Sequence, residues 1–230
     1  MALPTLLLAV HGTREPRGSA AARRLAGAVA ELTGAPVRLG FADVLAPDVG
    51  EVAAGIDGPV VVVPAFLAAG YHVRVDIPAQ LHRAGRGDAV VTGALGEDDR
   101  LLQAAVRRLR RAGWRTGEAV VLAAAGSSDP DARAQVDQAA QRLSRRLGGA
   151  GVEVGYVATA EPAVAEAVRR LRARGHRRVA LASWLLAPGL FHQRLAEAGA
   201  DSVARPLLPD AGVAAAVAAR YQAAALLAAV

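Results

Sequence analysis

The second half of the chain repeats the first half at an offset of about 115 residues. Three segments of one half match three of the other in the same order: 6–16 with 120–130, 37–47 with 152–162, and 66–72 with 185–192. Three ordered matches at a nearly constant offset are hard to obtain by chance. The repeat therefore predicts two similar domains, 1–114 and 115–230, that arose by internal duplication.

Short apolar runs alternate with longer amphipathic segments in both halves. The predicted strands are 5–10, 37–41, 60–64, 89–92, 119–124, 152–157, 179–183 and 202–204. The predicted helices include 19–33, 98–112, 129–147 and 162–175. Strands that are apolar on both faces and separated by helices are typical of parallel α/β sheets. Two such domains in one chain would face a cleft, which is a common place for a ligand.

Composition limits the chemistry that these domains can perform. The chain has no Cys, and all 27 of its basic residues are Arg. Thiolate nucleophiles, Cys-ligated zinc and iron–sulfur clusters are thereby excluded, as are Schiff-base lysines and the P-loop lysine. His, carboxylate, hydroxyl and Arg side chains remain, and only five of the residues are His.

The net charge of +6 fits either a GC-rich genome or an anionic partner. Nucleic acid is disfavoured, because only 3% of the residues are aromatic and the densest Arg runs fall on helical patterns. The first ten residues lack the features of a signal peptide, and Arg220 and Gln222 interrupt the apolar C-terminal stretch. We expect a cytoplasmic protein without a membrane span.

Three potential metal ligands follow three predicted strands. His11 follows the first strand, Asp43 the second and His72 the third. Because ligands bind beyond the carboxyl ends of parallel strands, these side chains can converge at one edge of a sheet. Two neutral imidazoles and a carboxylate suit a divalent first-row metal. The alternatives are hydrogen-bonded loop histidines and, for Asp43, a turn or cap residue.

The other histidines are weaker candidates. His82 is expected at the surface late in a helix, and His176 at a helix exit. His192 is the repeat partner of His72, but Ala125 and Ala158 stand where the first half has His11 and Asp43. The predicted site therefore belongs to the first half.

The turn at residues 11–18 is rich in Gly and precedes a helix. Its backbone N–H groups and Arg14 could hold an anion. The segment lacks the G-x-G-x-x-G order, so a phosphate- or nucleotide-binding enzyme is a weak alternative.

The chain resembles a known family in three places. Residues 6–16, with the His-Gly-Thr-Arg turn, are similar to the opening strand and turn of class II tetrapyrrole chelatases. Residues 64–78, PAFLAAGYHVRVDIP, resemble the second motif of that family and are the most specific part, and residues 41–47 resemble the element between them. The match is to the two-domain sirohydrochlorin chelatases and covers nearly the whole chain.

The resemblance implies two chelatase-like, flavodoxin-type domains that insert Co²⁺ or Fe²⁺ into sirohydrochlorin in sirohaem or cobalamin biosynthesis. It assigns metal binding and catalysis to His11 and His72. The family commonly has Glu where this chain has Asp43, whose shorter side chain favours a proton-accepting role or one behind the ligands. Residues expected to contact the anionic tetrapyrrole are Gly12, Thr13, Arg14, Phe66, Leu67, Tyr71 and Arg74.

Three points stay open at this stage. Ni²⁺ is a further candidate metal, because imidazole and carboxylate ligands accept several divalent ions. A carrier of metal or tetrapyrrole without turnover is the alternative function. No organic cofactor is expected, and the duplication is compatible with a monomer of two pseudo-symmetric domains.

Overall fold

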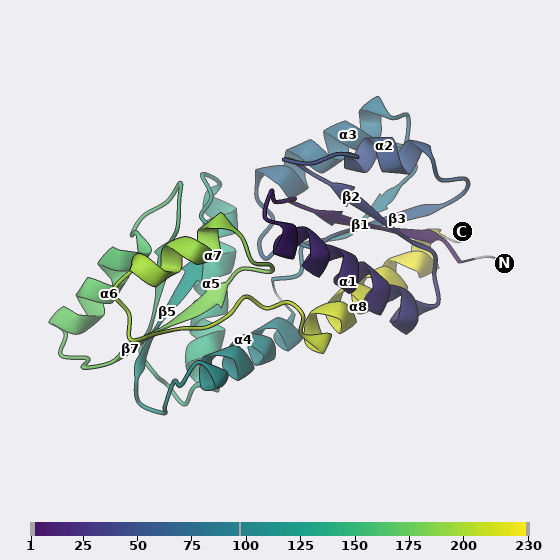
Figure 1. Cartoon of the computed structure of the whole chain (residues 1–230). Helices are drawn as coiled ribbons and strands as arrows, with labels where there is room; N and C mark the ends of the chain where they lie inside the picture. Colours follow the sequence, from purple (N-terminus) through teal and green to yellow (C-terminus); the bar gives the residue numbers. More distant parts are fainter. Residues whose placement is uncertain (1–2, 97, 229–230) are drawn as a thin grey trace. The chain divides into compact units, whose positions relative to one another are not determined.

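The computed structural model describes residues 3–96 and 98–228. The chain forms two compact units, each built around its own four-stranded parallel sheet (Figure 1). Unit 1 combines Met1–Leu95 with Pro209–Val230, and unit 2 consists of Gly96–Leu208. The predicted α/β class with two similar parallel-sheet domains is confirmed.

The sheet of unit 1 has the strand order β2-β1-β3-β4. Its strands are β1 (Thr5–Val10), β2 (Val37–Phe41), β3 (Val60–Pro64) and β4 (Val90–Val91). The central strand β1 pairs in parallel with both β2 and β3. The order therefore reverses beside β1, and such a switch point is where flavodoxin-type sheets bind their ligands.

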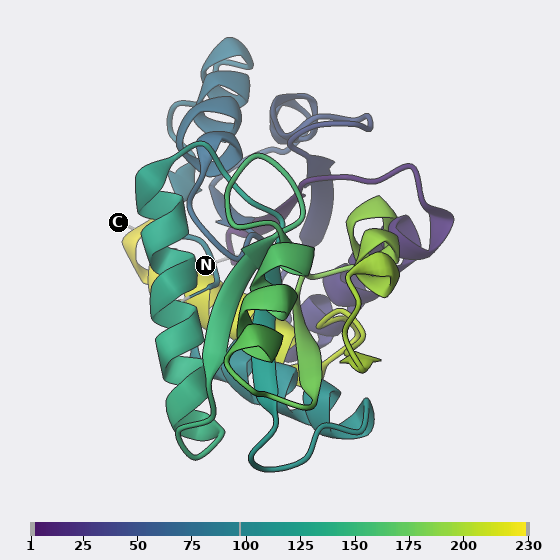
Figure 2. The ribbon, with the colours of Figure 1, turned by 90° about the vertical axis from the view of Figure 1, so that its left-hand side faces the viewer.

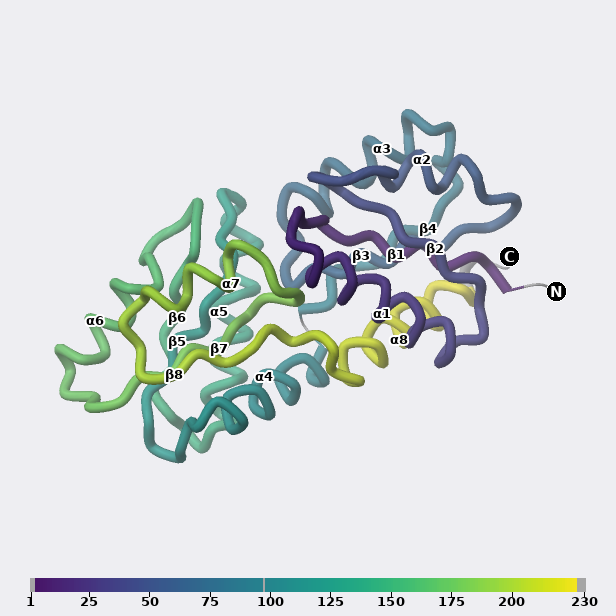
Figure 3. The backbone as a smooth tube through the Cα atoms, in the orientation of Figure 1, coloured from purple at the N-terminus to yellow at the C-terminus, as the bar shows by residue number. Residues whose placement is uncertain are grey.

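Helices cover both faces of this sheet (Figures 1 and 3). They are α1 (Pro16–Thr33), α2 (Val49–Ala54), the π-helical turn η1 (His72–Asp76), α3 (Ile77–Arg83) and α8 (Ala211–Ala228). Leu7 and Ala9 of β1 are buried beneath α2 and α3. Leu6 and Leu8 are also fully buried, and they point to the opposite face because side chains alternate along a strand.

Unit 2 repeats this plan, with helices packed around a sheet (Figure 2). Its strand order is β6-β5-β7-β8. Its strands are β5 (Ala119–Ala124), β6 (Val152–Tyr156), β7 (Val179–Trp184) and β8 (Ser202–Val203). Its helices are α4 (Asp99–Arg111), α5 (Pro130–Arg146), α6 (Val164–Ala173), α7 (Leu190–Arg194) and the 3₁₀ turn η2 (Leu195–Glu197).

The last helix of each sequence repeat belongs to the compact unit of the other repeat. Helix α4 packs on β7 and α5, whereas α8 packs on α1 and β3. The guanidinium of Arg108 on α4 donates to the Leu207 carbonyl (3.0 Å), and that of Arg220 on α8 donates to the Ala94 carbonyl (3.2 Å). The compact units therefore differ from the predicted domains 1–114 and 115–230, which follow the sequence repeat.

Among the described residues, no helix is long and apolar enough to cross a membrane. Helix α8, the most apolar by sequence, instead buries Val213, Val217 and Tyr221 in unit 1.

The attachment of α8 to unit 1 can be tested at Tyr221. Its buried hydroxyl donates to the Pro4 carbonyl at 2.6 Å. Tyr221→Phe removes the donor and leaves that carbonyl unsatisfied, so we expect the free energy of unfolding to fall by about 1–2 kcal/mol. Urea unfolding followed by circular dichroism measures the change.

Gln222→Ala is the matched control, because Gln222 is the next residue on α8 and is exposed. We expect its unfolding free energy to stay within about 0.5 kcal/mol of the unaltered protein. Equal stability of Tyr221→Phe and the unaltered protein would show that the hydroxyl does not hold the helix in place.

Candidate metal centre

Three side chains that could hold a metal ion lie together at the carboxyl edge of the unit 1 sheet. His11 follows β1, Asp43 follows β2 and His72 begins η1 after β3. One ligand atom from each lies within 4.8 Å of the others. The parallel pairing of β1 with β2 and β3 brings the three strand ends, and hence these residues, to one place.

Hydrogen bonds fix the tautomer of both imidazoles. Nδ1 of His11 lies 3.0 Å from the Gly12 carbonyl oxygen, and Nδ1 of His72 lies 2.6 Å from Oδ2 of Asp76. A carbonyl and an ionised carboxylate can only accept, so Nδ1 carries the proton in both rings. Each Nε2 therefore keeps a lone pair for a metal, as in carboxylate–histidine–metal arrangements. The two rings meet edge to face with centroids 4.6 Å apart.

Backbone hydrogen bonds hold Asp43 beside the His11 turn. The N–H of Asp43 donates to the His11 carbonyl at 3.1 Å, and Oδ1 of Asp43 accepts from the Val44 N–H at 2.7 Å. Gly12 allows this approach, because its φ is +93° and a Cβ there would lie 2.5 Å from the Asp43 carbonyl oxygen. Although Asp is shorter than Glu, the fold brings a carboxylate oxygen of Asp43 within 4.8 Å of a ring nitrogen of each His.

Gln80 on α3 forms hydrogen bonds with the backbone of the loop that carries Asp43. Its buried side chain donates from Nε2 to the Ala42 carbonyl (2.8 Å) and accepts at Oε1 from the Val49 N–H (3.0 Å). One amide thus clamps both ends of the loop that carries Asp43. Sequence reasoning missed Gln80, because a polar residue within an amphipathic helix gives no sign that its partners are loop backbone groups.

Asp76 was also missed, although the sequence contains a usable signal. It lies four residues after His72, a spacing at which side chains meet on a helix. Both side chains are about 30% exposed, so their hydrogen bond is only partly screened by water.

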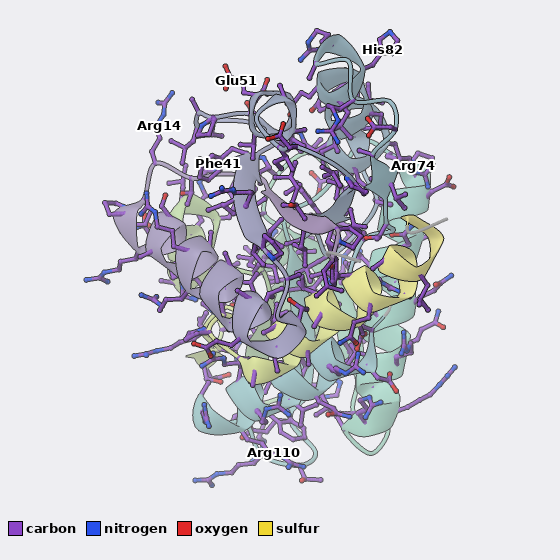
Figure 4. All side chains as sticks on the ribbon, turned by 90° about the vertical axis from the view of Figure 1, so that its right-hand side faces the viewer. Arg14, Phe41, Glu51, Arg74, His82 and Arg110 are labelled. Carbon is purple, nitrogen blue, oxygen red and sulfur yellow. The ribbon has the colours of Figure 1, made fainter. Side chains whose placement is uncertain are left out.

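The polar residues expected around the tetrapyrrole lie on separate segments. Thr13 is occupied locally, since its Oγ1 accepts from the Glu15 N–H at 3.1 Å. Arg14 and Arg74 are both exposed, and Figure 4 shows them on opposite sides of the view. Figure 4 also shows His82 at the far end of α3, and His82 is exposed, as predicted.

Two aromatic rings lie beside the imidazoles. Phe66 lies 6.0 Å from His72 and 6.5 Å from His11 between ring centroids, and Tyr71 lies 6.4 Å from His72. Phe66 and Leu67 are half-buried, whereas Tyr71 is 60% exposed. Val44 and Val75, which sequence reasoning did not single out, are also exposed.

The equivalent place in unit 2 has lost two of the three ligands. Ala125 follows β5 and Ala158 follows β6, in the positions of His11 and Asp43. His192 keeps the position of His72, but its Nε2 lies 3.3 Å from the Ala204 carbonyl. The cluster of possible metal ligands in the described part of the chain therefore lies in unit 1.

The comparison with known families agrees with this duplicated architecture. The CbiX family model matches residues 5–112 and again residues 119–224. The chain belongs to the CbiX family. The two matches fall on the two sequence repeats, so the family assignment covers both halves of the chain.

Several solved structures share the fold at low sequence identity. SirB from Bacillus subtilis with Fe³⁺ superimposes with a TM-score of 0.82 and 22% identity, covering 98% of this chain and 96% of SirB. The sirohydrochlorin chelatase SirB from Bacillus subtilis subspecies spizizenii with cobalt gives 0.78 and 21%, with the same coverage. CbiX, described as the terminal enzyme for biosynthesis of siroheme in denitrifying bacteria, gives 0.71 and 24%, covering 96% and 99%. A comparison with curated protein sequences gave no match.

The orientation of His72 can be tested through Asp76. Asp76→Ala removes the acceptor of the Nδ1 proton, so His72 can change tautomer and turn its Nε2 away. Loss of such a partner behind a ligating His typically weakens metal binding by about 10- to 100-fold. Isothermal titration calorimetry with Co²⁺ under anaerobic conditions measures the effect.

Asp57→Ala is the control, because Asp57 is an exposed carboxylate of unit 1 outside the site. We expect it to bind Co²⁺ with unchanged affinity. Equal affinity in Asp76→Ala would contradict the assigned role of Asp76.

Proposed function

We propose that the protein is a sirohydrochlorin chelatase that inserts a divalent metal, Co²⁺ or Fe²⁺, into the macrocycle. The observation that carries the proposal is the cluster of His11, Asp43 and His72, in which both imidazoles use Nδ1 for a hydrogen bond and keep Nε2 for a metal. Membership of the CbiX family and the shared fold with SirB support the same activity.

The metal is a substrate of this reaction. Two imidazole nitrogens and one carboxylate leave coordination positions open, so an incoming macrocycle nitrogen can bind before the protein ligands leave. Because His11 and Asp43 are exposed, a large flat substrate can reach the ion. Ni²⁺ would also be accepted by these donors.

The reaction must also remove two protons from the macrocycle as M²⁺ enters. As the metal passes from the protein to the ring, each Nε2 lone pair becomes free and can accept one of these protons. The bond from Nδ1 of His72 to Oδ2 of Asp76 holds the ring in place while Nε2 takes up the proton. Asp43 supplies a third acceptor at the same edge.

The charge distribution fits a polycarboxylate substrate. Unit 1 contains nine Arg and nine acidic residues, whereas unit 2 contains 18 Arg and 12 acidic residues. The net charge of +6 is therefore carried by unit 2. The net positive charge of the whole chain attracts an anionic substrate, and Arg14 and Arg74 of unit 1 can pair with individual carboxylates.

Further parts of the proposal concern the setting of the reaction. Gly12, Thr13, Phe66, Leu67 and Tyr71 are proposed to line the substrate site. We also propose a cytoplasmic monomer that works in sirohaem or cobalamin biosynthesis and uses no organic cofactor.

The proposal is tested by the absorbance change of sirohydrochlorin with Co²⁺ under anaerobic conditions. We expect substoichiometric protein to accelerate the change, and His11→Ala and His72→Ala to reduce the rate by roughly 100-fold or more. His82→Ala and His176→Ala are matched controls, because they remove a histidine outside the cluster and should retain full activity.

Two results would contradict the proposal. Equal rates in all four variants would show that His11 and His72 do not deliver the metal. A spectral change that stops at one equivalent of protein would identify a carrier of metal or tetrapyrrole, the alternative function.

A further inference from the structure

Val44, directly after Asp43, occupies a strained backbone conformation. Its φ is +69°, and the Leu45 N–H donates to the Asp43 carbonyl at 2.8 Å, which closes a γ-turn around Val44. A γ-turn with positive φ at its centre is rare and strained, and β-branched residues are especially disfavoured in this region. Glycine would occupy the position without that strain.

The same turn exists in unit 2 without metal ligands. Thr159 has a φ of +66°, and the Ala160 N–H donates to the Ala158 carbonyl at 2.7 Å. Since Ala158 replaces Asp43, the turn is a property of the repeated loop and does not require a metal site. The turn therefore does not explain why unit 1 has valine at its centre, since unit 2 forms the same turn with threonine.

Packing within unit 1 covers only part of the Val44 side chain. It is 41% exposed, so part of the benefit of burying an apolar residue is absent in the structure. Replacement by glycine would keep the Val44 N–H that holds Oδ1 of Asp43. The valine side chain is thus unnecessary for positioning the carboxylate, and part of its apolar surface is exposed next to Asp43.

Two other exposed apolar side chains lie close to His72 in the sequence. Tyr71 (60% exposed) precedes His72, and Val75 (43% exposed) follows it by three residues. Tyr71 and Val75 are four residues apart in a helical segment, so they share a face. We call Val44, Tyr71 and Val75 the apolar rim.

We propose that Val44 is a specificity residue that contacts the face of the tetrapyrrole. The inference rests on the proposed function and deepens it. A ligand that binds here must have an apolar surface large enough to cover the apolar rim. It must also be able to take a metal from His11, Asp43 and His72. A flat macrocycle with apolar faces and central nitrogens has both properties. The strained turn leaves part of the Val44 side chain exposed directly after Asp43.

The experiment compares Val44→Gly with Thr159→Gly, which makes the matched change in the equivalent turn of unit 2. Steady-state kinetics give the KM for sirohydrochlorin and kcat, calorimetry gives the Kd for Co²⁺, and thermal unfolding gives Tm. For Val44→Gly we expect KM to rise roughly 3- to 10-fold, as the partial loss of one apolar contact implies. We expect kcat and the Co²⁺ Kd to stay within about twofold, and Tm not to fall, because glycine relieves the strain.

Val44→Thr is a second variant that keeps the β-branched shape and exchanges a methyl group for a hydroxyl. It should raise KM in the same direction, and it provides the test if Val44→Gly does not fold. Thr159→Gly should leave KM unchanged while Tm does not fall.

Three results would overturn the inference. One is an unchanged KM in both Val44 variants, and another is an equal rise of KM in Thr159→Gly. The third is a rise of KM that accompanies an equally weakened affinity for Co²⁺, because Val44 would then act through Asp43. Failure of the unaltered protein to bind or convert sirohydrochlorin would overturn the proposed function and this inference together, whereas the other results leave the proposed function intact.

Discussion

The parallel pairing of β1 with both β2 and β3 is the constraint on which the site depends. It sets the ends of three strands side by side, although His11, Asp43 and His72 are widely separated in the sequence. The strands are almost entirely apolar because helices cover both faces of the sheet. The same buried strands that stabilise unit 1 therefore leave the polar donors only at the strand ends, where solvent and substrate can reach them.

Elements behind the donors then fix their orientation. Gly12 lets the Asp43 loop approach the His11 turn, Asp76 orients His72, and Gln80 clamps the loop that carries Asp43. Two of these three supports belong to one continuous segment, η1 and α3. A change in that segment would therefore alter both the imidazole and the carboxylate side of the site.

Much of this arrangement could be predicted from the sequence. The apolar runs at 5–10, 37–41 and 60–64 coincide with β1, β2 and β3, because strands buried on both faces leave a continuous apolar pattern. The edge strand predicted at 89–92 is shorter in the structure, Val90–Val91, where it pairs with β3 at two positions. The convergence of His11, Asp43 and His72 could also be predicted, because the carboxyl ends of parallel strands meet at one edge of a sheet.

Other features could not be predicted because they depend on contacts distant in sequence. The pattern of α4 shows that the helix buries one face, and the apolar composition of α8 shows that it is packed, but neither specifies which sheet receives the helix. The partners of Gln80 lie more than 30 residues away, at Ala42 and Val49. The positive φ of Val44 is hidden because valine ordinarily indicates extended backbone.

The central claim is that His11 and His72 bind the metal through Nε2 and that Asp43 completes the set. X-ray absorption spectroscopy of the Co²⁺-loaded protein tests it most directly, since imidazole ligands give a distinct scattering pattern. We predict two imidazoles bound to cobalt in the unaltered protein and one in His11→Ala. A spectrum without imidazole, or one that His11→Ala leaves unchanged, would contradict the account.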